Sequence, residues 1–248
     1  MSWMPTVRGV IRRRVLVNFR VDPGVAQRQL PPPFRPKLLR GEAVAGICLI
    51  RLEQLRPGLL PLPIGAASEN AAHRVAVEWE DADGRAREGV YIPRRDSGSR
   101  LNRLVGGRLF PGEHGAARFD VRDDEDSLRL AVRSADGEVA VDLVARPAAA
   151  LPATSRFASL AEASAFFAAG SLGYSARRDG GLEGLRLATR KWRIEPLAVE
   201  HVRSSYFADE RRFPPGSVAF DCALLMRDVE HAWLPAGLSR RDAAAAPA

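Results

Sequence analysis

The stretch from Ala117 to Pro147, ARFDVRDDEDSLRLAVRSADGEVAVDLVARP, decides the fold class of this protein. Apolar and polar residues alternate there in three short runs, which is typical of strands that turn one face toward a core. Acidic turns at 123–126 and 136–137 separate the runs, so we expect a three-stranded antiparallel meander. The apolar positions are Phe119, Val121, Leu128, Leu130, Val132, Val139, Val141 and Leu143.

Similar strand patterns lie upstream of the meander. Residues 15–21 alternate in the same way, and Ala43 to Ile50 is apolar at nearly every position. We expect the second of these to be covered on both faces, at the centre of the sheet. Residues 75–79 and 89–92 flank a turn at Asp81 to Gly84, which predicts a hairpin. The Pro-rich segment from Leu55 to Gly65 is expected to be a loop.

Helix signals are few. Asp22 followed by Pro23 is typical of a helix start, and we expect a short helix to about Leu30. Ser159 and Glu162 form a capping box for a second helix, which Gly170 ends.

The last third of the chain returns to strands, at 196–207 and 217–226. Leu185 and Leu187 alternate in one phase and Trp192 and Ile194 in the other, so a bulge is expected between them.

The whole pattern contains about ten strands and three helices, with no break in composition. A sheet of this size must curl or close to protect its edges. We therefore expect a mainly β protein, a curved antiparallel β-barrel with peripheral helices. Residues 1–235 are expected to form one domain, and the Ala-rich residues 236–248 a disordered tail.

Charge and cysteine content restrict the partners. The chain has 37 basic and 30 acidic residues, a net charge of +7, but the two signs are interleaved and no basic tail occurs. We therefore expect no nucleic-acid partner. No apolar run reaches the length of a membrane span, and the two cysteines, Cys48 and Cys222, lie far apart. These features favour a cytoplasmic protein without a membrane partner, and leave a homo-oligomer open.

The segment from Gly89 to His114, GVYIPRRDSGSRLNRLVGGRLFPGEH, carries five arginines. Its strand is expected to end at Pro93, and a helix capped by Ser97 or Ser99 to follow, with Gly106-Gly107 as its stop. Arg94 and Arg95 are adjacent, so one of them should point inward. An inward arginine needs an anion, supplied either by a protein carboxylate such as Glu69 or Glu78 or by a ligand.

Three residues are candidates for proton transfer. Glu113 and His114 follow a Gly/Pro turn and could form an acid/base pair, or could be an exposed turn. Glu69 could lie at the mouth of a barrel, or at the start of a surface strand. The four histidines are scattered and no nucleotide-binding loop is present, so we expect no metal and no cofactor.

Five segments resemble the domain-of-unknown-function family 2071 over nearly the whole chain. That family resembles acetoacetate decarboxylase at a distance, which implies a cone-like antiparallel β-barrel with a central pocket. The segments are RRRVLVNFRVDPGVAQRQLPPPF (12–34), GICLIRL (46–52), SENAAHR (68–74), residues 89–109 and residues 204–221.

The resemblance also indicates which chemistry is missing. The decarboxylases form a Schiff base through a lysine that a second lysine activates. That lysine pair follows a Gly/aromatic/Pro turn, and the matching turn here, Phe110-Pro111-Gly112, is followed by Glu113 and His114 instead. By similarity, Arg12 matches the pocket arginine and Glu69 the pocket glutamate. Lys191, between Arg190 and Arg193, remains as a substitute nucleophile, although most strand lysines face water.

The sequence thus predicts an internal pocket for a small carboxylated or oxo compound. In one hypothesis the protein is a lyase-type enzyme without a Schiff base, in which Arg12 and Arg94 or Arg95 hold the anion and Glu69, Glu113 and His114 are the acid/base candidates. In the alternative, it is a non-catalytic binding protein that has lost the decarboxylase lysine. A basic surface for nucleic acid is a weaker third possibility.

Overall fold

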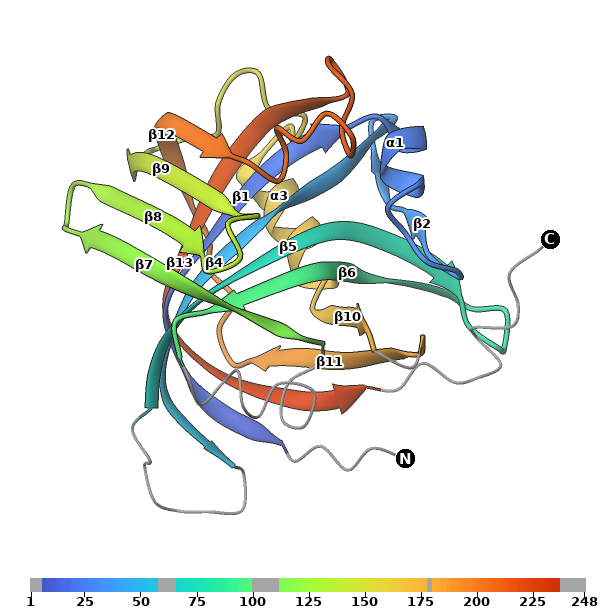
Figure 1. Ribbon diagram of the computed structural model, residues 1–248, viewed down its shortest axis with the longest axis horizontal. Coiled ribbons are helices and arrows are strands. Elements are labelled where there is room, and N and C mark those ends of the chain that lie inside the picture. The colour runs from blue at the N-terminus through green and yellow to red at the C-terminus, as the bar shows by residue number, and fades with distance from the viewer. Residues whose placement is uncertain (1–5, 58–65, 100–111, 178–179, 237–248) are drawn as a thin grey trace.

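The computed structural model describes residues 6–57, 66–99, 112–177 and 180–236. Its strands are β1 (Val7–Val21), β2 (Arg35–Pro36), β3 (Leu38–Leu39), β4 (Glu42–Pro57), β5 (Ala66–Glu80), β6 (Ala86–Ser97), β7 (His114–Asp123), β8 (Leu128–Ser134), β9 (Ala140–Pro147), β10 (Leu172–Ala176), β11 (Leu182–Thr189), β12 (Glu195–Ser204) and β13 (Val218–Ala236), and its helices are α1 (Pro23–Gln27) and α3 (Leu160–Ala169). The protein is mainly β, as expected (Figure 1).

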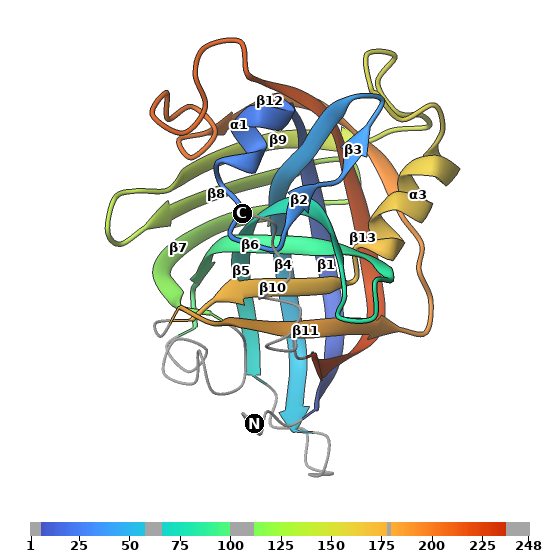
Figure 2. The ribbon, with the colours of Figure 1, turned by 90° about the vertical axis from the view of Figure 1, so that its right-hand side faces the viewer.

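The strands form one strongly curved sheet whose pairings close two rings. Both rings contain β13, β1, β4, β5 and β6, which pair in that order. The small ring returns from β6 to β13 through β10 and β11, and these two strands cross in front of the others in Figure 2. The large ring returns through β7, β8, β9 and β12. The five shared strands therefore have one face toward each ring.

The shared strands are buried on both faces, as the apolar run predicted. In β4 every residue from Ala43 to Leu49 is buried. Along β1, Val15, Val17 and Phe19 pack into the core of the large ring, whereas Leu16 packs on the opposite face with residues of α3. A polar residue without a hydrogen-bond partner at any of these buried positions would destabilise the sheet.

The local signals mostly form the predicted elements. Residues 114–147 form the meander, and β5 and β6 form the hairpin. The Asp22 carboxylate caps α1 by accepting from the Val25 N–H at 2.9 Å, although this helix ends at Gln27. In α3 the Ser159 hydroxyl accepts from the Glu162 N–H at 3.1 Å, and Gly170 is the C-cap.

Two local predictions are wrong. Strand β6 does not end at Pro93 but continues to Ser97, because a bulge places Ile92 and Pro93 opposite a single residue of β5, where no N–H is needed. No bulge joins Leu187 to Trp192 either. The chain leaves the sheet after Thr189, because β11 and β12 pair with separate stretches of β13.

Several predictions fall outside the described residues. The helix expected after Ser99, most of the Pro-rich loop and all but the first residue of the expected C-terminal tail belong to this group. Strand β4 continues to Pro57, so the Pro-rich segment is a strand at its start.

Candidate functional site

A cavity of about 130 Å³ lies within the small ring. Apolar side chains from three strands form much of its wall, among them Ile50, Leu52, Ile92, Leu185 and Leu187. Ser171, between α3 and β10, is one of its polar groups, and the others, from β1, β4, β5, β6 and β7, are Arg14, Cys48, Asn70, Arg74, Arg95, Asp96 and His114. Ligand sites in proteins commonly have this composition, an apolar wall with a few polar groups.

The bulge at Pro93 decides which arginine of the Arg94-Arg95 pair faces the cavity. Val90 and Ile92 line the cavity, so simple alternation would direct Arg94 there. The extra residue reverses the alternation, and Arg95 lines the cavity instead. Its Nε donates to the Ser175 hydroxyl at 3.2 Å, and burial lowers its pKa to about 10.

Arg94 is fully neutralised by the protein. Its guanidinium pairs with Asp96 at 2.8 Å, with Asp136 at 2.8 Å and with Glu138 at 2.9 Å. The hydrogen bond with Asp96 is the main cause of a raised Arg94 pKa. The sequence left open whether a protein carboxylate or a ligand would pair with an inward arginine. Protein carboxylates pair with Arg94, whereas Arg95 has no carboxylate within 4.0 Å among the described residues.

Two more arginines, Arg14 and Arg74, face the same cavity. The Arg74 guanidinium donates to the Asn18 side-chain oxygen and lies 4.9 Å from the centre of the Phe167 ring. Burial lowers the Arg74 pKa to about 10. The Arg14 Nε is 3.3 Å from the Cys48 sulfur, and its guanidinium carbon is 5.8 Å from the centre of the Trp192 ring.

No carboxylate of the described chain pairs directly with these three arginines, although the charge of the more distant Glu183 acts to raise the Arg95 pKa. Neither Arg14 nor Arg74 nor Arg95 has a carboxylate oxygen within 4.0 Å, and Asp96, which also lines the cavity, has both oxygens bonded to Arg94. Buried Arg14 Nη1 and Arg74 Nε have no hydrogen-bond partner among the residues that the structure describes. Burying a cation without a counter-ion is costly, so the cavity favours an anion.

His114 lies beside Arg95. The two residues are paired in the parallel ladder between β6 and β7, and both line the cavity. Glu113 is exposed and lines an adjoining hollow of about 250 Å³, which Arg94 and Arg95 also border. Thus Arg95, His114 and Glu113 are brought to one place by the fold.

Arg12 and Glu69 lie elsewhere. Arg12 is exposed and pairs with Glu53 at 3.1 Å and with Asp228 at 2.5 Å. Glu69 pairs with the buried Arg13 at 2.7 Å, and neither Arg12 nor Glu69 lines the cavity. A register shift between Ile11 and Arg13 lies at this point of β1. The sequence reasoning therefore missed Arg14 and Arg74, and alternation alone offered no signal for them.

The two lysines do not line the cavity. Lys37 pairs with Glu88 and lies 4.4 Å from the centre of the Phe166 ring. Lys191 is exposed in the connection between β11 and β12. A lysine nucleophile is therefore not present at this site.

The described residues hold no group of three or more His, Cys, Asp or Glu side chains placed to bind a metal ion. None of the helices in this part of the chain is long and apolar enough to cross a membrane.

Solved structures of acetoacetate decarboxylase-like proteins share the fold. Acetoacetate decarboxylase from Legionella pneumophila is 16% identical with a TM-score of 0.57, over 95% of this chain and 87% of that one. An acetoacetate decarboxylase-like enzyme from Sphingomonas wittichii is 14% identical with a TM-score of 0.55, over 95% and 92%. The enduracididine biosynthesis enzyme MppR complexed with pyruvate is 13% identical with a TM-score of 0.56, over 96% and 92%.

Sequence comparison identifies the family of this protein. None of the curated proteins matches the chain. One protein family, DUF2071, described as an uncharacterized conserved protein, matches residues 10–225. The match spans most of the chain, and this protein belongs to the DUF2071 family.

Proposed function

We propose that the cavity of the small ring binds a small organic carboxylate, with or without an oxo group. The observation that carries this proposal is the set of three guanidinium groups, of Arg14, Arg74 and Arg95, that line one cavity and have no carboxylate oxygen within 4.0 Å among the described residues. Arginine binds carboxylates through two parallel charge-assisted hydrogen bonds. The apolar wall suits the hydrocarbon part of such a compound.

The structural neighbours support a small carboxylate as the ligand. One of them, MppR, was solved in complex with pyruvate, and others are decarboxylases of a 3-oxo acid. Because these proteins are less than a fifth identical to this chain, they share its fold only, and the argument for this chain depends on its own arginines.

If the protein is an enzyme, we propose that His114 carries out acid/base catalysis. His114 lies next to the anion-binding Arg95, where it could move a proton to or from a bound carbonyl compound. Glu113 would assist from the adjoining hollow. A Schiff base has no part in this mechanism, since both lysines lie outside the cavity. Arg12, Arg94 and Glu69, which pair with other protein side chains, have no ligand contact in it.

The alternative is a binding protein without catalysis, and one pair of measurements separates the two. Calorimetry should show pyruvate or acetoacetate binding to the protein and neutral acetone not binding. Arg95→Gln should weaken that binding by about 10-fold or more, since a hydrogen bond to a charged group contributes about 1.5–3 kcal/mol. Arg118 is exposed and lies within 4.0 Å of no carboxylate in the described part of the chain, so Arg118→Gln provides the control variant.

Proton NMR of the bound compound then tests for turnover. If the protein is an enzyme, His114→Asn should stop turnover and leave binding within about 2-fold, as expected when a proton-transfer group alone is lost. Binding with no turnover by the unsubstituted protein favours the non-catalytic alternative. Failure of all the carboxylates to bind, or equal binding by the Arg95→Gln variant, would overturn the proposed function.

A further inference from the structure

We propose that the ligand is a short aliphatic dicarboxylate, with two carboxylates on a chain of about four to six carbon atoms, a size that a cavity of this volume can hold. The inference rests on the proposed anion-binding function of the cavity, and it adds how many carboxylates the ligand carries and how far apart they are. It follows from where the three arginines lie around the cavity.

The arginines divide between two ends of the cavity. Arg14 and Arg74 also border a smaller hollow beside Phe167 and Gly170, where α3 packs on the sheet. Arg95 instead borders the hollow formed by Gly112, Glu113 and Ser175. Burial is the main cause of the lowered Arg74 pKa, and the charge of Arg14 contributes to it.

Much of the cavity wall is apolar. Ile50 and Leu52 from β4 and Leu185 and Leu187 from β11 contribute to it. Such a wall offers a hydrocarbon chain the apolar contact that stabilises buried CH₂ groups, whereas a chain of hydroxyl groups would lose its hydrogen bonds with water there.

One carboxylate is too small to satisfy both ends. Its two oxygen atoms can accept from one guanidinium fork, or from two adjacent ones such as Arg14 and Arg74. The unpartnered buried donors, Arg14 Nη1 and Arg74 Nε, are both at that end. Arg95, which is half-buried, would then have the Ser175 hydroxyl as its hydrogen-bond partner and the charge of Glu183 only from beyond 4.0 Å, so a second anionic group of the ligand would give it a direct ion pair.

Other arginines of this protein show how it neutralises a buried cation when no ligand is involved. Arg13 is paired with Glu69 and Asp123, and Arg94 is paired with three carboxylates. At the cavity, no described carboxylate lies within 4.0 Å of any of the three arginines, so none of them has a direct ion pair. A dicarboxylate would supply such pairs.

The test compares glutarate with glutaramate, which has the same carbon chain but one carboxylate replaced by an amide. Calorimetry on the full chain should give a dissociation constant for glutarate at least about 10-fold lower than that for glutaramate, because a second charge-assisted contact is lost in the amide. In Arg95→Gln this ratio should fall to about one, while Arg118→Gln should keep it.

Each outcome decides between the two proposals. Equal affinities of the unsubstituted protein for glutarate and glutaramate would overturn the dicarboxylate inference and leave the proposed function standing. If neither compound nor pyruvate binds, the proposed function itself fails. An unchanged ratio in Arg95→Gln would remove Arg95 as the second anchor and with it the inference. Thermal unfolding of each variant checks folding, and if Arg95→Gln does not fold, Arg95→Lys should retain a ratio above one but below that of the unsubstituted protein.

Discussion

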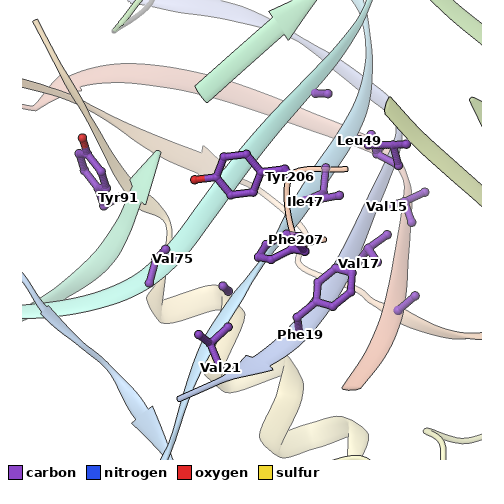
Figure 3. Packing of buried hydrophobic residues seen from close by; sticks show 14 of the residues in the cluster. Val15, Val17, Phe19, Val21, Ile47, Leu49, Val75, Tyr91, Tyr206 and Phe207 are labelled. Atoms are coloured by element: carbon purple, nitrogen blue, oxygen red, sulfur yellow. The ribbon is translucent and has the colours of Figure 1, made fainter. Parts of the chain in front are cut away.

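The two faces of the shared strands differ in how closely their side chains pack and in whether their arginines are paired with carboxylates. On the large-ring side, aromatic and aliphatic residues fill the interior, with the rings of Phe19 and Phe207 stacked at 4.4 Å (Figure 3). On the small-ring side, a cavity remains. Arg13 and Arg14 are adjacent in β1, yet Arg13 pairs with two carboxylates on one side and Arg14 faces the cavity without any.

This difference separates stability from binding. Close packing and paired charges stabilise the fold, whereas unfilled volume and unneutralised cations destabilise a protein in the absence of a ligand. Both the cavity and the arginines without a paired carboxylate lie on the small-ring face, whereas the opposite face is closely packed. This arrangement supports the proposal that the small ring binds a ligand. Three pairs of variants test this comparison.

The largest difference should appear between two isoleucines of β4. Ile47 is fully buried on the large-ring side, so Ile47→Ala should lower the free energy of unfolding by about 2–5 kcal/mol. Ile50 is half-buried and already borders the cavity, so Ile50→Ala should cost about 1 kcal/mol. Urea unfolding of both variants measures the two losses. Equal losses would mean that the two faces are packed alike.

Arg13 and Arg14 give the next largest difference. Arg13→Gln leaves Glu69 and Asp123 without their buried partner, and we expect a loss of about 3 kcal/mol in the free energy of unfolding. Arg14→Gln removes a cation that no carboxylate neutralises, and stability should stay within about 1 kcal/mol. Chemical denaturation without ligand tests this, and a loss at Arg14 as large as that at Arg13 would contradict the conclusion that Arg13 is paired with carboxylates and Arg14 is not.

The last comparison concerns pH and His73 on the large-ring side, where the effect is spread over several pH units. His73 is fully buried against Tyr206, and burial, with smaller contributions from Arg94 and Arg212, lowers its pKa from 6.5 to about 3. Between these values the unfolded chain binds a proton that the folded protein does not. Stability should therefore fall as the pH falls from 6.5 toward 3, by about 1.4 kcal/mol per pH unit from this group.

His73→Phe keeps the ring and removes the titration, so the free energy of unfolding should depend less on pH over this range. The exposed His201 supplies the control variant His201→Phe, whose pH dependence should match that of the unsubstituted protein. If His73→Phe has the same slope as the control, burial of a neutral His73 is not a source of acid sensitivity.

Much of the fold could be predicted because it depends on local patterns. The alternation in 117–147 and the continuous apolar run from Ala43 predicted strands of the right kind, and Asp22 and Ser159 predicted the starts of two helices. Each of these signals depends on residues within a few positions of one another. A cytoplasmic location and a homo-oligomeric state remain predictions from the sequence.

The site was predicted only in part, because it depends on register. Arg95, Glu113 and His114 come together in the fold. Arg12 was expected in the pocket and lies at the surface, whereas Arg14, two residues along, faces the cavity. A shift of one residue moves a side chain to the other face of a strand, and no local pattern specifies where such a shift occurs.

The sequence by itself determined that this is a β-rich protein of the DUF2071 family, with many arginines and only two lysines. The tertiary structure alone decided which arginines are neutralised and which face a cavity. The physical reason is that charge pairing occurs between distant strands, here β1 with β5 and β7, and bulges at Pro93 and near Ile11 set the direction of each guanidinium.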